Sequence, residues 1–514
     1  MKKTFVRIVT AAACLVVLAA CSEYRDDFFN YAVKDGMVLE DLALADYEGS
    51  GDKFEEFTDN PFIKAAVQPT STFSVDADGA AYAVMRNYLT HGYNIDKSSV
   101  RIEEFLNYFT FDYAEPTDDN TIAINGEVGD CPWNEKHCLL RLGIKGKSIE
   151  KDVMPQANFV FLVDVSGSMS GEDRLDLLTS GLTRLLTELN PDDRISLITY
   201  SGEVNKLLES TPVREADKIK KAIKKLNADG CTAGGKALEM AYKEALANYN
   251  PAYNNRIIMG TDGDFNVGVT NTDSLVAMVE RYARQGIYMT CLGFGMGNFN
   301  DAMMERISNA GNGTYNYIDC ENEMMKVFVH ERERFLSVAN DTKCQVTFDS
   351  TLVSAYRLIG YENRVMNNED FEDDTKDAGE IGAGQTITAL YEIVLNEDFW
   401  NTVDFNPSAY PDIVTFDVRY KKSLDGAGIP LQLKLRADAA LGLEHMRSTE
   451  FYFAAGVATY GMILRDSPYK GDATIDMAEK LVEKGLTFDP HGYRAELLEL
   501  IKKAEALQQG QSLK

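Results

Sequence analysis

Between Asn158 and about Ser337, short apolar runs alternate with amphipathic stretches, and this alternation limits the fold more than any other feature of the chain. Phe159 to Val163 is a continuous apolar run. The leucines that follow recur at helical spacing: Leu175, Leu178, Leu182, Leu185, Leu186 and Leu189. Apolar strands joined through helices are typical of a parallel sheet covered on both faces. We therefore expect a doubly wound, mostly parallel α/β domain at 155–338.

The segments on either side of this domain have different patterns. Residues 61–154 begin with helix-like stretches and end in strand patterns at 121–145, whereas 339–446 contains five strand patterns and 447–514 is helical. Two or three strands are marginally stable alone, and the two ends of a domain often lie close together. We therefore expect one β-rich platform built from both flanks, with the α/β domain inserted into it. Two independent modules in line remain the alternative.

The first twenty residues have the pattern of an export signal. Three basic residues precede Ile8 to Leu18, an uncharged apolar run too short to span a bilayer as a helix. The run ends in Leu18-Ala19-Ala20-Cys21, which resembles the lipobox of bacterial lipoproteins and implies that Cys21 is lipidated after cleavage. An ordinary secretory signal is the alternative. Residues 21–60 are acidic and indicate a charged tether, with order expected to begin near Pro61.

The export signal sets the compartment. Because no other apolar run is long enough to span a bilayer, the lipid is expected to be the only membrane anchor. Ser22, rather than Asp, follows the lipidated cysteine, which favours the outer over the inner membrane of the cell envelope, with the leaflet left open. An oxidising compartment permits disulfides, but the sequence leaves the pairing open among Cys131, Cys138, Cys231, Cys291, Cys320 and Cys344. Of these, Cys131 and Cys138 are spaced to close a hairpin, and Cys291 is expected to be a buried free thiol.

The charge balance excludes one class of partner. The chain has 80 Asp and Glu against 52 Lys and Arg, a formal net charge of −28, and no basic stripe in the sequence reverses it locally. A phosphate backbone would be repelled. Nucleic acid is therefore not an expected partner.

Oxygen-bearing side chains gather where three predicted elements meet one edge of the sheet. Asp164, Ser166 and Ser168 follow the first strand as Asp-Val-Ser-Gly-Ser, Thr232 precedes a predicted helix, and Asp262 follows the strand at 256–260. Ligands of open α/β sheets bind beyond the carboxyl ends of the strands, and Mg²⁺ prefers oxygen ligands. The sequence therefore predicts a divalent cation here, Mg²⁺ first, with Mn²⁺ or Ca²⁺ as alternatives.

This order of residues resembles the von Willebrand factor type A (vWA) domain and its metal-ion-dependent adhesion site. The resemblance implies that Ser166, Ser168 and Thr232 bind the metal directly, while Asp164 and Asp262 complete the shell, largely through water. It also implies an open metal position that accepts a carboxylate from a partner protein. A vWA fold whose metal is absent or only stabilising is the alternative.

The resemblance continues into both flanks. The strings from Ser71 to Asp76 and from Arg101 to Phe109 resemble the N-terminal companion region of a family of bacterial vWA lipoproteins. The strings from Tyr356 to Arg364 and from Asp377 to Gly384 resemble its C-terminal domain of unknown function.

Other motifs in the sequence give weaker indications of function. Gly230 to Lys236 begins like a phosphate-binding loop, but Ala237 replaces the hydroxyl that would hold Mg²⁺. Asp76 to Gly79 has a weak likeness to a calcium loop without the remaining ligands, which favours a turn with a helix cap. Asp264 is expected to be a solvated loop carboxylate. No nucleophile, acid–base pair or cofactor loop is evident, so we do not expect an enzyme.

These features predict a lipid-anchored, extracytoplasmic binding protein whose vWA domain captures a protein ligand through a bound cation. The ligand itself is not identified by the sequence, although it is expected to offer an acidic side chain to the metal. The alternative is a scaffold subunit of an envelope complex whose vWA face meets a fixed partner.

Overall fold

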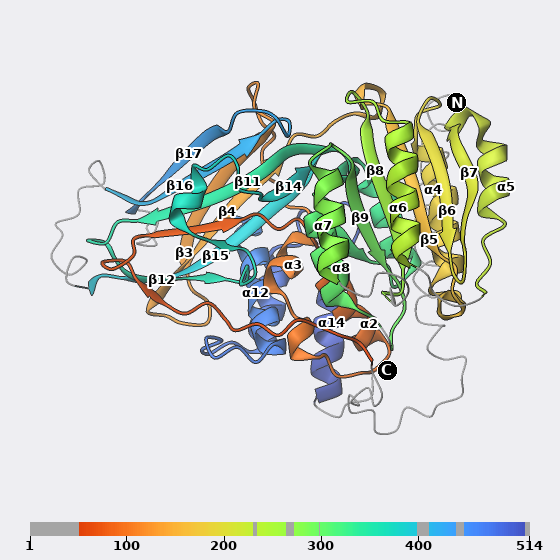
Figure 1. Ribbon diagram of the computed structural model, residues 1–514. Helices are drawn as coiled ribbons and strands as arrows, with labels where there is room; N and C mark the ends of the chain where they lie inside the picture. The colour runs from red at the N-terminus through yellow and green to blue at the C-terminus, as the bar shows by residue number, and fades with distance from the viewer. Residues whose placement is uncertain are drawn as a thin grey trace, which may run out of the picture. The chain divides into compact units, whose positions relative to one another are not determined.

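The computed structural model describes residues 51–229, 234–263, 272–297, 299–397, 411–437 and 447–508. Three β-sheets organise this part of the chain (Figure 1). One belongs to the predicted α/β domain and is called the central sheet. The other two, called the first and second flanking sheets, are built from the segments before and after that domain. None of the described helices is long and apolar enough to cross a bilayer.

The central sheet has the strand order β10-β9-β8-β5-β6-β7. Its strands are β5 (Ala157–Asp164), β6 (Arg194–Tyr200), β7 (Val204–Pro212), β8 (Asn254–Thr261), β9 (Tyr288–Gly293) and β10 (Tyr315–Tyr317). All neighbours pair in parallel except β6 and β7. The expected doubly wound, mostly parallel sheet is confirmed, with an antiparallel edge strand that the sequence pattern did not predict.

Helices cover both faces of the central sheet because side chains alternate along its strands. Phe159, Phe161 and Val163 of β5 pack into one apolar core with the buried face of the helix at 175–188. Val160 and Leu162 point into the opposite core. The first core is covered by α4 (Leu175–Glu188), α5 (Ala216–Ile223) and α9 (Glu321–Met325). The second is covered by α2 (Ala80–Thr90), α6 (Gly234–Ala247), α7 (Thr272–Ala283) and α8 (Asp301–Ala310).

The first flanking sheet joins strands from both flanks in the order β1-β12-β15-β4-β3. Its strands are β1 (Ile63–Lys64), β3 (Ile122–Asp130), β4 (His137–Gly146), β12 (Val353–Ile359) and β15 (Thr386–Leu395). β4 pairs along nine residues with β15, so the segment before the α/β domain and the segment after it share one ladder. The shared platform that the strand patterns predicted is therefore present.

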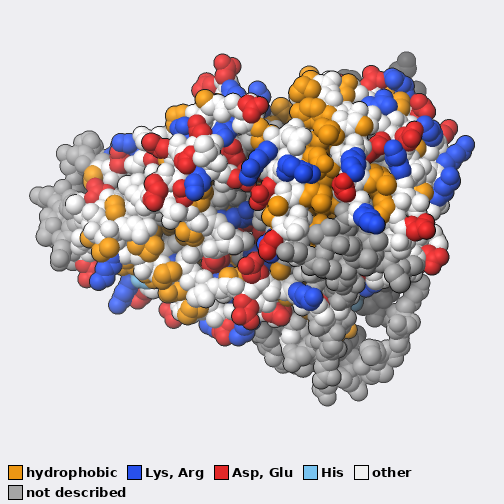
Figure 2. Space-filling model, viewed as in Figure 1, with side chains coloured by type: hydrophobic (Ala, Val, Ile, Leu, Met, Phe, Trp, Pro, Cys, Tyr) orange, Lys and Arg blue, Asp and Glu red, His pale blue; other side chains and the backbone are white. Residues whose placement is uncertain are grey.

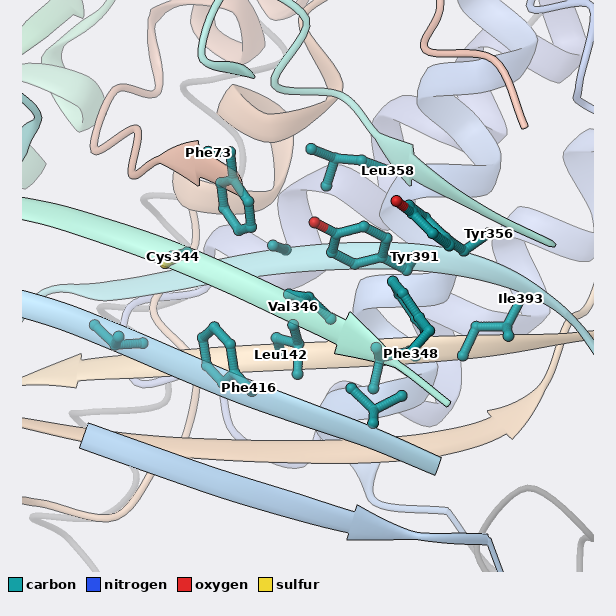
Figure 3. Packing of buried hydrophobic residues seen from close by; sticks show 14 of the residues in the cluster. Phe73, Leu142, Cys344, Val346, Phe348, Tyr356, Leu358, Tyr391, Ile393 and Phe416 are labelled. Atoms are coloured by element: carbon teal, nitrogen blue, oxygen red, sulfur yellow. The ribbon is translucent and has the colours of Figure 1, made fainter. Parts of the chain in front are cut away.

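The second flanking sheet also mixes the two flanks, in the order β13-β2-β11-β16-β17, with β14 paired to β11. Its strands are β2 (Thr70–Ser74), β11 (Ser337–Phe348), β13 (Val365–Met366), β14 (Gly379–Gly382), β16 (Asp412–Lys421) and β17 (Ile429–Arg436). Figure 3 shows Phe73, Val346 and Phe348 of this sheet lying against Leu142, Tyr391 and Ile393 of the first flanking sheet. One apolar core thus joins the two flanking sheets face to face.

Four further helices complete the flanks: α3 (Ile102–Asn107), α12 (Thr449–Leu464), α13 (Ile475–Lys484) and α14 (Tyr493–Gln508). The C-terminal helical segment is therefore as expected. α12 packs against α13 and α3. Its buried residues lie around almost the whole circumference of the helix.

Three expectations need correction or completion. The tether predicted for 21–60 is too long, because Gly51 donates to the carbonyl of Gly297 and Asp52 accepts from the backbone N–H groups of Gly297 and Phe299. Residues 21–50 lie outside the described residues. The five described cysteines are free thiols, so Cys131 and Cys138 are not bonded, and Cys291 is buried as expected. Cys231 lies outside the described residues.

The helix cap predicted at Asp76 to Gly79 is wrong. Gly79 occupies the N-cap position of α2, where no side chain accepts a capping hydrogen bond. Asp76 instead accepts from the backbone N–H of Asp78, which forms a turn, and Glu104 accepts from the N–H of Ala81.

Candidate metal centre

Asp164 is the last residue of β5 and is held at both carboxylate oxygens. Its Oδ1 accepts from the backbone N–H of Ser166 at 2.9 Å, and its Oδ2 accepts from Thr261 Oγ1 at 3.0 Å. The side chain is fully buried. A carboxylate fixed in this way keeps one position at the carboxyl edge of the central sheet, which is where the sequence predicted the cation.

The two predicted serine ligands lie together beyond Asp164. Ser166 Oγ and Ser168 Oγ are 3.0 Å apart, and Gly167–Met169 forms a short 3₁₀ turn that brings them to the same side. Ser166 is buried and Ser168 is exposed. The pair therefore reaches from the sheet edge to the surface, so an ion held here would be open to a partner.

Asp262 reaches the same edge from the neighbouring strand. β8 pairs in parallel with β5, with Gly260 opposite Val163, so the residues that follow the two strands emerge side by side. Asp262 is buried. Burial raises the pKa of Asp164 to about 6, and the charge of Asp262 adds to the rise, while hydrogen bonds from Ser166 and Thr261 oppose it. A cation beside Asp164 would favour the ionised form of its carboxylate.

The predicted threonine ligand, Thr232, lies outside the described residues, as does Asp264. The residues that flank its loop are placed. Asp229 donates its backbone N–H to the carbonyl of Val165 at 2.8 Å, and α6 begins at Gly234 and packs against β5 and β6. Asp229, three residues before Thr232, therefore lies directly beside the loop that contains both serines.

The residues present fit a hard divalent cation. Four predicted side chains, Asp164, Ser166, Ser168 and Asp262, meet at one edge, and all of them offer oxygen, the ligand atom that Mg²⁺ and Ca²⁺ prefer. Thr261 was missed as a contributor to the site. Its position immediately before Asp262 is the signal that could have identified it, because its hydroxyl orients Asp164 across the two strands.

Family models match successive parts of the chain. A model described as von Willebrand factor type A domain matches residues 159–264, and one described as von Willebrand factor matches 48–141. A third, described as uncharacterized protein YfbK, C-terminal, matches 333–507. Together these matches cover the first part of the α/β domain and most of both flanks.

Two sequence relatives differ in how much of the chain they share. An uncharacterized Synechocystis protein is 28% identical over 201 residues, covering 39% of this chain and 46% of that protein. The uncharacterized protein YfbK of Escherichia coli is 36% identical over 473 residues, covering 88% of this chain and 81% of YfbK.

Solved structures align less well. A von Willebrand factor type A protein from Catenulispora acidiphila has a TM-score of 0.41 at 14% identity, over 76% of this chain and 89% of that chain. The conserved hypothetical protein BatB from Bacteroides thetaiotaomicron has a TM-score of 0.29 at 22% identity, over 35% of this chain and 98% of that chain. Family membership rests instead on the sequence match to YfbK over 88% of this chain: the chain belongs to the YfbK family, and its residues 159–264 match the von Willebrand factor type A domain.

Proposed function

We propose that the protein is a lipid-anchored, extracytoplasmic binding module whose vWA domain captures an acidic group of a protein ligand through a divalent cation. The observation that carries the proposal is the meeting of Asp164, Ser166 and Ser168 at the carboxyl edge of the central sheet, beside Asp262. Ser168 is exposed there, so a partner can reach an ion that it holds.

Charge explains why a cation would be needed. The chain has a net charge of −28, and Figure 2 shows acidic and basic side chains interspersed over the face that it draws. An acidic ligand is repelled by such a protein as a whole. A bound divalent cation reverses the sign locally, and because hydroxyl ligands are neutral, it retains positive charge for a carboxylate of the partner.

The residues of the site have separate parts in this proposal. Ser166 and Ser168, together with Thr232, would hold the cation directly through hydroxyl oxygens. Asp164 would act as an oriented charge, because Thr261 and the Ser166 backbone fix both of its oxygens. Asp262 would balance the ion from the adjacent strand. We propose Mg²⁺ as the ion.

A binding role fits the serines better than catalysis does. Ser166 Oγ contacts the hydroxyl of Ser168 and the carboxylate of Asp164, so both hydroxyls converge on one point as ligands would. A nucleophilic serine instead needs a base that removes its proton.

The proposed lipid anchor rests on the basic start, the short apolar run and Cys21 of the sequence. We propose the outer membrane as the location of the protein.

The test is metal binding by the mature chain. Added Mg²⁺ or Mn²⁺ should raise the melting temperature by mass action. The double change Ser168→Ala with Thr232→Ala should remove most of that rise and leave the fold intact, whereas Ser170→Ala, at an exposed serine of the same loop outside the motif, should keep it. An equal thermal shift in the double variant and the wild type would place the ion elsewhere.

The scaffold role is the second candidate, because α2 of the N-terminal flank packs into a core of the vWA domain. A fixed partner of that kind would stay bound in EDTA and dissociate in detergent. A ligand captured through the cation would dissociate in EDTA and stay bound in detergent.

A further inference from the structure

Three carboxylates that are far apart in the sequence meet away from the vWA metal centre. They are Asp76 and Asp78, between β2 and α2, and Glu305 on α8. One oxygen of each lies within 4.8 Å of the others, and all three side chains are buried, with relative exposures of 1%, 2% and 4%. Burial of ionised carboxylates is costly unless each has a partner.

Two of these carboxylates are held through one oxygen and present the other without a partner. Asp78 Oδ1 accepts from the backbone N–H of Tyr315 at 2.7 Å, and Glu305 Oε1 accepts from Asn309 Nδ2 at 3.0 Å. Asp78 Oδ2 and Glu305 Oε2 are buried and have no hydrogen-bond partner among the described residues. Leaving a buried acceptor without a partner is costly, and more so when the group is charged. These two oxygens are therefore left for a group that the described residues do not supply.

Arg364 is the basic residue within the cluster, and it does not balance the charge. Its Nε donates to Asp76 Oδ2 at 3.0 Å and its Nη2 to Glu305 Oε1 at 3.2 Å, but Nη2 is 3.9 Å from Asp78 Oδ2, beyond hydrogen-bond distance. Three carboxylates and one guanidinium leave an excess of two negative charges when all are ionised. Burial raises the pKa of Asp78 well above its ordinary value, and the charges of Asp76 and Glu305 add to the rise.

We infer that Asp76, Asp78 and Glu305 form a second cation site, which binds Ca²⁺. The two positive charges of Ca²⁺ match the two negative charges that Arg364 leaves unbalanced when all three carboxylates are ionised. Ca²⁺ binds oxygen at about 2.3–2.6 Å, so ligands on opposite sides of the ion lie up to about 5 Å apart, whereas the corresponding separation for Mg²⁺ is about 4.2 Å. Oxygens that all lie within 4.8 Å of one another are close enough to share one Ca²⁺.

The surroundings allow an ion to enter and give it a structural role. All three carboxylates line a cavity of about 500 Å³. Asp76 and Asp78 belong to the N-terminal flank, Glu305 to the vWA domain, and Arg364 to the C-terminal flank. A bound Ca²⁺ braces the vWA domain against the segment that enters the platform, at a place where the carboxylates would otherwise repel one another.

The experiment uses the full mature chain, freed of metal with EGTA and then kept in excess Mg²⁺ to occupy the vWA site. Equilibrium dialysis should find one bound Ca²⁺ per chain, and Ca²⁺ should raise the melting temperature along a saturable one-site curve. The isosteric double change Asp78→Asn with Glu305→Gln should abolish both effects. Glu280→Gln, which removes a charge from the same cavity but not from the cluster, should keep them.

Three further outcomes bear on the second site. Ser166→Ala with Ser168→Ala should keep the Ca²⁺ response, so a loss of the vWA metal does not count against the second site. If wild-type protein binds no Ca²⁺ and the double variant melts higher than wild type, a shared proton between Asp78 and Glu305 replaces the ion and the inference is overturned. If the double variant does not fold, dialysis of the wild type alone still decides, because a result of no Ca²⁺ refutes the site.

Discussion

Glu392 lies where three parts of the platform meet, and its replacement tests whether the two flanks are one folded unit. Its Oε2 is 2.9 Å from Arg357 Nη2, and both side chains are only 2% exposed. Its Oε1 contacts Nδ1 of His137 on β4. Arg357 also stacks over the ring of Tyr469, 4.5 Å from its centroid. Residues from the N-terminal flank and from two places in the C-terminal flank thus depend on one carboxylate.

The change Glu392→Gln keeps the shape of the side chain and removes its charge. The guanidinium of Arg357 would then be buried without its counter-ion, and breaking a buried pair in this way costs about 3–5 kcal/mol. Net stabilities are commonly about 5–15 kcal/mol, so the loss is a large share of the total. For a folded unit of this length it corresponds to a fall in melting temperature of about 3–5 °C.

Urea unfolding of the mature chain followed by circular dichroism measures the loss. The matched control is Glu499→Gln, at a carboxylate whose side chain is 71% exposed, where the free energy of unfolding should change by less than about 0.5 kcal/mol. Replacing both partners, as Arg357→Met with Glu392→Leu, should recover most of the stability because no buried charge remains. A Glu392→Gln variant within about 1 kcal/mol of wild type would refute the argument.

Three further predictions follow from other parts of the molecule. Burial and the charge of Glu362 raise the pKa of Glu103 to about 8. The contribution of Glu103 to stability is therefore full below about pH 4.5 and is lost as pH rises through 8. Glu103→Gln should flatten this decline in melting temperature from pH 5 to 8, and an unchanged decline would contradict the prediction. Cys21→Ser should release the protein from the membrane fraction, and unchanged partitioning into detergent would exclude the lipid anchor. A fragment of residues 61–338 leaves β4 without β15 and should aggregate or be cleaved within 61–150, whereas a stable, cooperatively melting fragment would contradict the shared platform.

The central sheet was predictable because its strands carry strong local patterns. Phe159 to Val163 is apolar throughout and is buried on both faces, as parallel strands are. β7 was missed because only three of its nine residues are buried at the sheet edge, and its sequence has no continuous apolar run. β14 was missed because Gly379–Gly382 is too short and glycine-rich to resemble a strand.

The two candidate sites also differ in how far the sequence predicts them. Asp164, Ser166 and Ser168 lie within one short motif, so the sequence alone brings them together. Asp78 and Glu305 belong to different domains, and only the packing of α8 and α2 against β10 makes them neighbours. A set of ligands assembled by tertiary packing leaves no spacing pattern in the sequence.

The central claim is that a cation at the vWA site captures a protein ligand. Its most direct measurement is a crosslinking pull-down from envelope extract with the mature chain, in Mg²⁺ and in EDTA, beside the Ser166→Ala with Ser168→Ala variant. Wild-type protein should retain a partner in Mg²⁺ and lose it in EDTA, and the variant should not retain it in Mg²⁺. A partner bound equally in all three conditions would contradict the claim.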